Sequence, residues 1–117
     1  MSDLPIVDAD SIANLRDLNP GDNGEFLREI ITIYLEDTPK RIAEMKEALA
    51  SGDASTFTRS AHTIKGSSSN VGALALRGVA EQLEKAGKSG GLAGLSAQIE
   101  ECDRQFALAA AELRKLC

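Results

Sequence analysis

Apolar residues recur every three or four positions along most of this chain, and polar residues fill the positions between them. This spacing matches the 3.6-residue turn of an α-helix, in which residues so spaced share one face. No segment shows the strict alternation of apolar and polar residues that is typical of a half-buried β-strand. The pattern therefore predicts an all-α protein.

Glycine-containing turns divide the chain into one short helix and four longer ones. We expect the short helix at residues 10–18, followed by a strong turn over residues 19–24. Asp22 in that turn and Glu25 directly after it have the spacing of a capping box that opens the next helix. Consecutive helices with short connections pack antiparallel. The sequence thus predicts an up-and-down antiparallel four-helix bundle over residues 24–116, with the short N-terminal helix over one end.

Pro39 interrupts the second helix, and two interpretations compete there. Thr38 and Pro39 could be the N-cap and first residue of a new helix. However, the apolar spacing passes through Thr38 without a change of phase, which favours one long helix kinked at the proline. The residues expected on its inner face are Leu27, Ile31, Tyr34, Thr38, Ile42, Met45 and Leu49.

The three later helices each have a clear beginning or end. Asp53 is placed to cap the third helix, which Gly72 closes, and the fourth stops near Gly87. The last helix follows the turn at residues 89–91 and has the most regular stripe. The inner-face residues are Phe57, Ala61, Ile64, Ser68 and Val71 in the third helix; Leu76, Val79, Ala80 and Leu83 in the fourth; and Leu92, Leu95, Ile99, Cys102, Phe106, Ala109, Leu113 and Leu116 in the last.

Composition limits the class of protein. With 117 residues and 43% hydrophobic content, the chain (residues 1–117) is expected to form one soluble domain with a sufficient core of its own. A net charge of −5 argues against a nucleic-acid binder. The segment from Met1 to Ile12 has no apolar signal region, and no apolar run is long enough to span a membrane. Two widely separated cysteines form no metal motif. We expect a reduced protein of the cytoplasm, and we expect it to be a monomer.

The only histidine, His62, lies within the third helix. At 100° per residue, it stands about 150° from the centre of that helix's apolar face. We therefore expect its imidazole to point away from the core. The residues expected around it are Ser55, Thr58, Arg59, Lys65, Gly66 and Ser69.

Most known catalytic motifs are missing. Residues 87–89 end like a P-loop, but Gln82 stands where its first glycine belongs, and no strand precedes it. A serine triad would have to use the outward-facing His62. Cys102 is on the apolar stripe and is expected in the core. We expect the glutamates other than Glu84 to lie on solvated helix faces, and we predict neither a cofactor nor a metal site.

A surface histidine without a role is the ordinary interpretation of such a residue, but its neighbours argue for a reactive group. Gly66 lies one turn further along the same face, where a helix-interior glycine costs roughly 1 kcal/mol relative to alanine. Close approach of another molecule would compensate that cost. Neutral imidazole keeps a nitrogen lone pair that can attack phosphorus, and Lys65 could stabilise the charge of the arriving group.

Residues 61–68 (AHTIKGSS), with Gly72 and with Leu83-Glu84 before Gly87, resemble the histidine-containing phosphotransfer (HPt) domain over residues 24–116. The resemblance implies that His62 takes a phosphoryl group from the aspartate of one response-regulator receiver domain and passes it to another. It also implies a hybrid sensor histidine kinase as the source of the phosphoryl group.

By the same match, Lys65 would assist the phosphoryl group, and Gly66 would admit the receiver. We expect Thr58, Arg59 and Ser69 to contact that partner as well. Several family members have glutamine where Glu84 stands. A carboxylate there could accept the imidazole N–H and fix the tautomer, or it could repel the phosphate.

Two other classes of function remain in view. One is a helical docking module that binds receivers without being phosphorylated, although a pure scaffold needs no histidine, lysine and glycine at this spacing. The other is a true hydrolase or kinase, which the lack of a nucleotide motif and of a second catalytic base disfavours.

Overall fold

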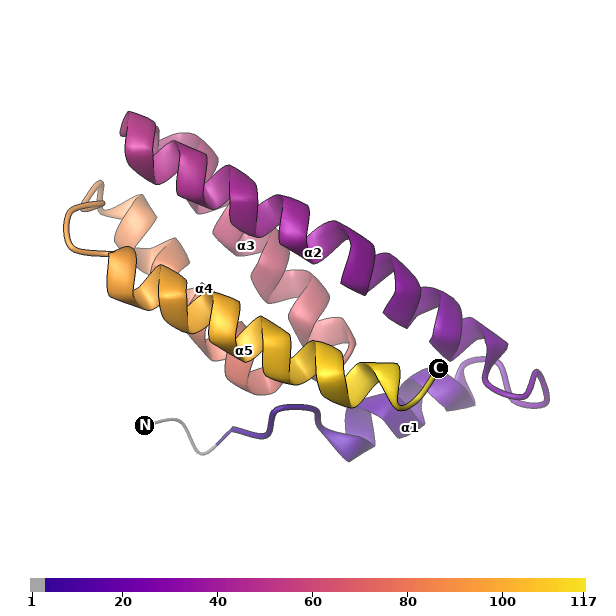
Figure 1. Ribbon diagram of the computed structural model, residues 1–117. Coiled ribbons are helices and arrows are strands. Elements are labelled where there is room, and N and C mark those ends of the chain that lie inside the picture. Colours follow the sequence, from indigo (N-terminus) through magenta and orange to yellow (C-terminus); the bar gives the residue numbers. More distant parts are fainter. Residues whose placement is uncertain (1–3) are drawn as a thin grey trace.

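The computed structural model describes residues 4–117 and contains five α-helices (Figure 1). No strand occurs among these residues. The helices are α1 (Ala9–Asp17), α2 (Glu25–Ser51), α3 (Ala54–Asn70), α4 (Leu74–Lys88) and α5 (Ser96–Arg114). The predicted all-α fold is confirmed, with the long helices α2 to α5 side by side. Residues 1–3 of the predicted single domain lie outside the described residues.

A single apolar cluster fills the space between the long helices. The side chains of Phe57, Ile31, Met45 and Leu83 are almost completely buried in it. All the inner-face residues expected on α3 are buried. On α2 and α4 the exceptions are Leu49 and Val79, which are partly buried against the same cluster. The helical periodicity therefore identified the core.

Pro39 lies inside α2, which is one continuous helix from Glu25 to Ser51. The interpretation as one long helix is confirmed, and a new helix at Pro39 is wrong. Thr38 is buried on the inner face, whereas Pro39 is exposed. The apolar stripe thus holds the helix together across the proline, because packing outweighs the loss of one backbone hydrogen bond.

Two helix starts differ from the sequence prediction. The capping box is wrong, because α2 has Gly24 as its N-cap in a left-handed conformation. The Asp22 carboxylate still accepts from the backbone N–H of Gly24 and of Phe26. The last helix begins at Ser96 rather than near Leu92, since Gly94 adopts φ +77° and breaks the helix there.

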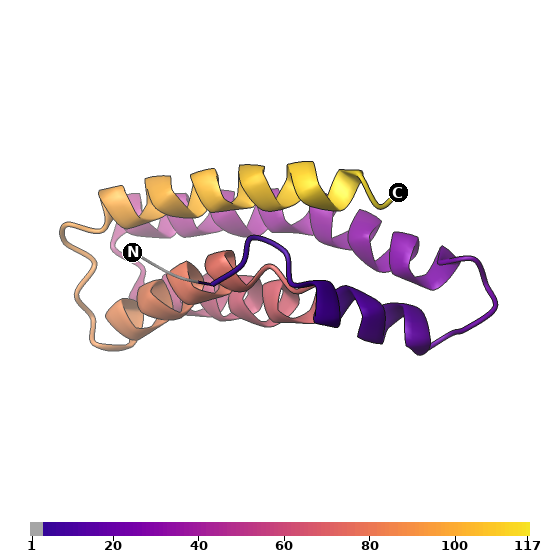
Figure 2. The same cartoon turned by 90° about the horizontal axis from the view of Figure 1, so that it is seen from below.

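The short helix α1 covers one end of the bundle, as predicted (Figure 2). Asp8 caps α1 by accepting from Ser11, and its own backbone N–H donates to the Gly72 carbonyl at 2.8 Å. Gly72 has φ +77°, and a Cβ there would lie 2.7 Å from the Cβ of Ser11. The turn between α3 and α4 therefore requires glycine for its backbone conformation and for the contact with α1.

The segment before α1 runs along α4. The Pro5 carbonyl accepts from the backbone N–H of Ala75, at the start of α4. A Cβ on Gly78 would lie 3.3 Å from Cδ1 of Leu4. This glycine, which the sequence pattern leaves unexplained, gives the N-terminal segment a close path over α4.

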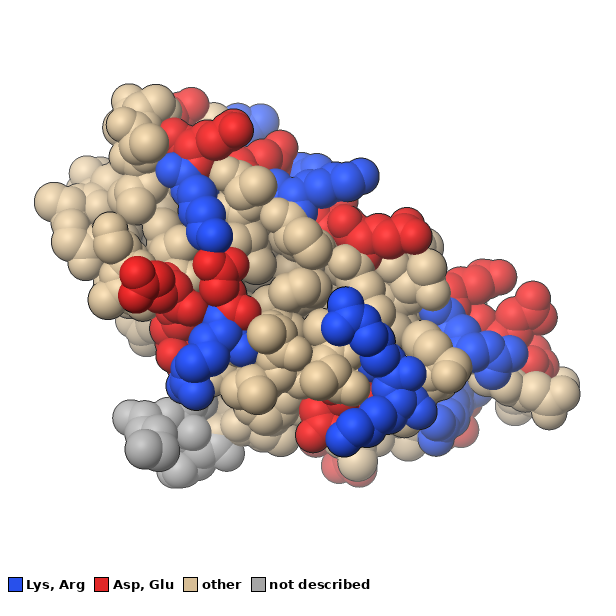
Figure 3. All heavy atoms as spheres, in the orientation of Figure 1, with Lys and Arg blue, Asp and Glu red and all other residues tan. Residues whose placement is uncertain are grey.

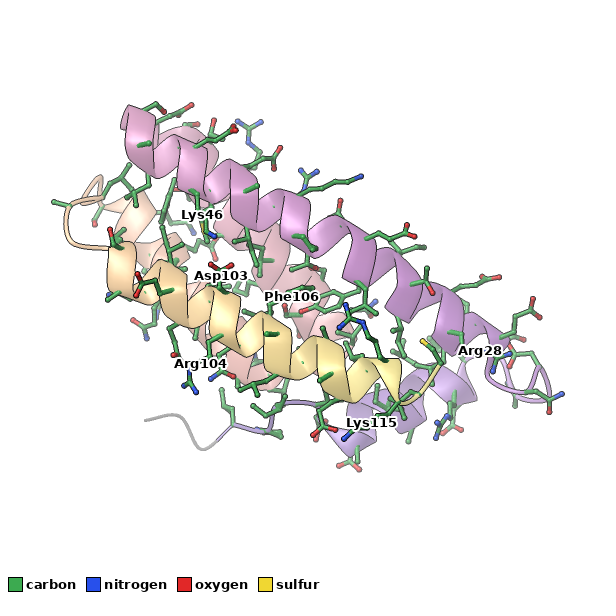
Figure 4. The ribbon with its side chains drawn as sticks, viewed as in Figure 1. Arg28, Lys46, Asp103, Arg104, Phe106 and Lys115 are labelled. Atoms are coloured by element: carbon green, nitrogen blue, oxygen red, sulfur yellow. The ribbon has the colours of Figure 1, made fainter. Side chains whose placement is uncertain are left out.

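The face formed by α2 and α5 carries acidic and basic side chains spread over its surface (Figure 3). Lys46 of α2 and Asp103 of α5 form an ion pair of 2.7 Å across the two helices (Figure 4). Arg104 donates two hydrogen bonds to Glu101 within α5. Beneath this face, the Phe106 ring packs against Tyr34, with ring centroids 6.0 Å apart. The ion pairs of Lys46 and Arg104 on this face thus join charges within α5 or between α2 and α5.

Candidate functional site

Helix α3 presents His62 to solvent from its midpoint. The Asp53 side chain caps α3 by accepting from the backbone N–H of Thr56, as predicted. Ala61 and Ile64 are completely buried on the opposite face. The His62 side chain is 65% exposed. The amphipathic pattern of α3 therefore fixes the outward direction of the imidazole.

The inner face of α3 packs closely on α2 through a small polar residue. Ser68 is completely buried, and its hydroxyl is 2.8 Å from the hydroxyl of Tyr34. This bond satisfies both hydroxyls and links the two helices in the core. Burial raises the pKa of Tyr34 to about 12, so its hydroxyl stays neutral.

Helix α4 also packs closely on α3, and Gly87 makes this possible. A Cβ on Gly87 would collide with Oγ1 of Thr58 and lie 3.0 Å from Cδ1 of Phe57. The end of α4 therefore lies directly against the first half of α3. Glu84, almost one turn earlier on α4, is thereby brought to His62.

Glu84 is buried and makes three polar contacts. Its Oε2 is 2.7 Å from Nδ1 of His62 and 3.3 Å from Nζ of Lys88. Its Oε1 is 2.6 Å from Nζ of Lys65. Only 5% of the Glu84 side chain is exposed. A buried carboxylate is stable when partners of this kind surround it.

The neighbouring donors keep Glu84 ionised. Lys65 above all, together with His62 and Lys88, lowers the pKa of Glu84 to about 2, although burial opposes this shift. An ionised carboxylate can only accept hydrogen bonds, so Nδ1 of His62 must carry the proton. In the neutral ring the lone pair then resides on Nε2, which is the nitrogen on the far side of the ring from Glu84.

A solvent-open hollow of about 650 Å³ lies beside His62, between α3 and α4. Of the residues expected around the histidine, Ser55, Thr58 and Arg59 line it. It is also lined by Ala54, His62, Glu84, Gly87 and Lys88. The hollow thus extends from His62 toward the beginning of α3.

Gly66 and Ser69 lie on the other side of His62, outside this hollow. A Cβ added to Gly66 would meet no atom within 4 Å. Ser69 is exposed and lines a separate depression together with Asn14 and Leu18 of α1. The expected partner residues therefore flank the histidine from both ends of α3 rather than gathering in one pocket.

Lys88 is the residue of this site that sequence reasoning missed. It was considered only as part of an imperfect P-loop ending. The available signal was its position four residues after Glu84, which places the two side chains on one helix face. Glu84 itself was separated correctly from the solvated glutamates.

Further observations concern Cys102 and the acidic side chains of residues 4–117. Cys102 is buried, and burial raises the pKa of its thiol to about 12, which agrees with the predicted core role. Within residues 4–117, no three His, Cys, Asp or Glu side chains are grouped as a metal site. None of the described helices is long and apolar enough to cross a membrane.

Comparisons with known proteins agree with this geometry. The family model described as Hpt domain matches residues 29–116. The solved structure of histidine-containing phosphotransfer protein B from Pseudomonas aeruginosa is similar to the chain, with a TM-score of 0.86 and 30% identity. That match covers 95% of this chain and 93% of the other. The HPT domain of a sensor hybrid histidine kinase from Shewanella shares the fold, with a TM-score of 0.77, 16% identity, and 95% and 92% of the two chains covered.

A curated relative is multistep phosphorelay regulator 1 of Schizosaccharomyces pombe, which is 28% identical over 87 residues. The match covers 74% of this chain but only 30% of that protein. The family match, the structural similarity and the exposed histidine held by a buried carboxylate lead to one conclusion. The chain belongs to the Hpt domain family of histidine-containing phosphotransfer domains.

Proposed function

We propose that this chain carries a phosphoryl group on Nε2 of His62 between receiver domains of a multistep two-component phosphorelay. The observation that supports the site most strongly is the hydrogen bond from Nδ1 of His62 to the buried Glu84. It leaves the nucleophilic nitrogen on the exposed side of the ring.

In the forward step, the Nε2 lone pair attacks the phosphorus of an aspartyl phosphate on the donor receiver. The P–O bond to that aspartate breaks, and its electron pair returns to the carboxylate. The imidazole then carries a positive charge, and the Glu84 carboxylate stabilises it by accepting the hydrogen bond from Nδ1–H. In the next step, a second receiver's carboxylate attacks phosphorus, and the ring leaves as neutral imidazole. The chain is thus a covalent carrier rather than an independent catalyst.

The surrounding residues have supporting roles in this proposal. Lys65 contributes positive charge beside the reacting group. Gly66 leaves open space for the receiver's active site. Thr58 and Arg59 on one side of His62, and Ser69 on the other, form the contact surface.

The proposed partners are receiver domains and a hybrid sensor histidine kinase. The family match and the phosphorelay relative support this class of partner. We place the exchange in the cytoplasm and expect the chain to act as a monomeric single domain without a cofactor. The donor aspartate and the metal ion of the reaction would come from the receiver.

Replacing His62 with glutamine tests the site directly. The variant should take no acid-labile phosphate from phosphorylated receivers, whereas the wild type should take it. The variant should remain folded because the ring is mostly exposed, and the lost hydrogen bond to the buried Glu84 should lower the free energy of unfolding by about 1 kcal/mol. Phosphate uptake equal to wild type would refute the assignment. Receiver binding without uptake by the wild type would instead favour the docking module.

A further inference from the structure

Two lysines contact Glu84, and the structure holds them in different ways. Nζ of Lys65 is 2.6 Å from Oε1, and the Lys65 side chain is 30% exposed. Nζ of Lys88 is 3.3 Å from Oε2, and its side chain is 66% exposed. Lys65 is therefore the more firmly fixed of the two, and Lys88 the freer.

The two carboxylate oxygens of Glu84 also differ in the partners that each would keep if its lysine moved away. Oε2 bonds to Nδ1 of His62 as well as to Lys88, so it keeps a strong donor when Lys88 moves away. Among the described residues, Lys65 is the contact found for Oε1. If Lys65 moved away, this buried oxygen would lose the cation that stabilises its negative charge. The Lys88 end of its ion pair is exposed and the 3.3 Å contact is the longer of the two, so this pair is the weaker one. Lys88 can leave Glu84 at small cost, and Lys65 cannot.

Lys88 and His62 line the same hollow between α3 and α4. A phosphoryl group on Nε2 brings up to two negative charges to a histidine whose other nitrogen already faces the carboxylate of Glu84. A cation beside the phosphoryl oxygens would offset that repulsion. The four-carbon side chain of a lysine can rotate into a hollow of this kind without movement of its helix.

We propose that Lys88 is a further catalytic residue, which moves from Glu84 to bind the phosphoryl oxygens on His62. This inference rests on the proposed function. It gives the two lysines different tasks: Lys65 stays on Glu84 and adds its positive charge from there, whereas Lys88 binds the phosphoryl oxygens directly.

The test uses phosphoramidate, a small donor that requires no receiver. Nε2 of His62 attacks its phosphorus, the P–N bond of the donor breaks, and ammonia leaves with the proton it needs from water. Lys88→Gln should slow this uptake by about three- to tenfold, the range for losing one charge-assisted contact near the surface. Lys88→Arg should retain most of the rate. Phosphorus NMR should show a higher pKa for the phosphoryl group on His62 in Lys88→Gln.

Lys85→Gln is the matched control, since it removes the same charge from an exposed position on the same helix but outside the hollow. It should leave the uptake rate and the phosphoryl pKa at the wild-type values, and thermal unfolding should be the same for both glutamine variants.

If Lys88→Gln and Lys85→Gln have equal uptake rates and equal phosphoryl pKa values, the role of Lys88 is refuted while the function of His62 stands. If Lys88→Gln is less stable and Lys88→Arg does not restore uptake, Lys88 is structural, and the proposal is again refuted. If the wild type takes no phosphate from either phosphoramidate or receivers, the proposed function and the role of Lys88 both fail.

Discussion

Gly66 of α3 and Gly87 of α4 both lie inside helices, where glycine is intrinsically unfavourable. Their surroundings are opposite. A Cβ on Gly66 would enter open space, whereas a Cβ on Gly87 would collide with Thr58 and crowd Phe57. Gly87 is therefore explained by the fold itself, since it lets α4 approach α3. No atom of the described residues comes near a Cβ at Gly66, so packing within them does not explain this glycine, and the contact with a receiver remains our proposal for it.

Gly87→Ala should have the largest effect on stability. The added methyl group must push α4 away from α3, and overpacking of this kind costs about 1–3 kcal/mol, more than the gain in helix propensity. Urea unfolding should show the loss. The separation should also weaken the contact of Glu84 with His62 and lower phosphate uptake.

The double variant Gly87→Ala with Thr58→Ala is the control for this explanation. Removing the Thr58 hydroxyl makes room for the new methyl group, so part of the lost stability should return as a non-additive term. Simple additivity of the two changes would show that the helices are not separated at this point.

The second prediction concerns the carboxylate that this close approach buries. The pKa of Glu84 is lowered from an ordinary 4.5 to about 2, first by Lys65. Its stabilising contribution is therefore present above pH 4.5 and is lost as the pH falls toward 2. Urea unfolding between pH 6 and pH 3 should show a steeper loss of stability for the wild type than for Glu84→Gln.

Glu101→Gln is the matched control for this titration. Arg104 lowers the pKa of Glu101 to about 2 as well, but Glu101 lies on the surface of α5, where solvent screens the interaction. The pH dependence of Glu101→Gln should stay close to that of the wild type. If both variants altered the pH dependence of unfolding equally, the burial of Glu84 beside His62 would add nothing to its contribution to stability.

The smallest expected change in stability comes from Gly66. Gly66→Ala should stabilise the domain by up to about 1 kcal/mol, opposite in sign to Gly87→Ala. Gly66→Gln should fold normally but slow transfer from a receiver, because the longer side chain occupies the partner's space. Thermal unfolding and transfer rates on the same variants test both. A Gly66→Gln variant as fast as wild type would remove the reason for placing a partner there.

Much of the fold could be predicted because its signals are local. The 3.6-residue repeat identified the inner faces of the helices, and Asp53 and Gly72 marked the limits of α3. The errors occurred where backbone conformation overrides a pattern. The left-handed Gly24 and Gly94 displaced the starts of α2 and α5, although the flanking residues fitted a helix.

The candidate site was predictable only in part, for a related reason. His62, Lys65 and Gly66 share one helix, so their relative positions follow from spacing alone. The contact between His62 and Glu84 joins residues 22 positions apart on different helices. Family resemblance drew attention to Glu84, but its ionised state depends on Lys65 and Lys88 reaching the same buried carboxylate.

The helices, their inner faces and the outward direction of His62 can be read from the sequence, because each of these depends on neighbours within a few turns. The tertiary structure alone decided how closely α4 lies against α3, and with it the burial of Glu84, the tautomer of His62 and the different freedom of the two lysines. These properties depend on distances between helices. Such distances are fixed by the side chains that meet at the contact, such as Gly87 and Thr58, and no periodicity along one helix encodes them.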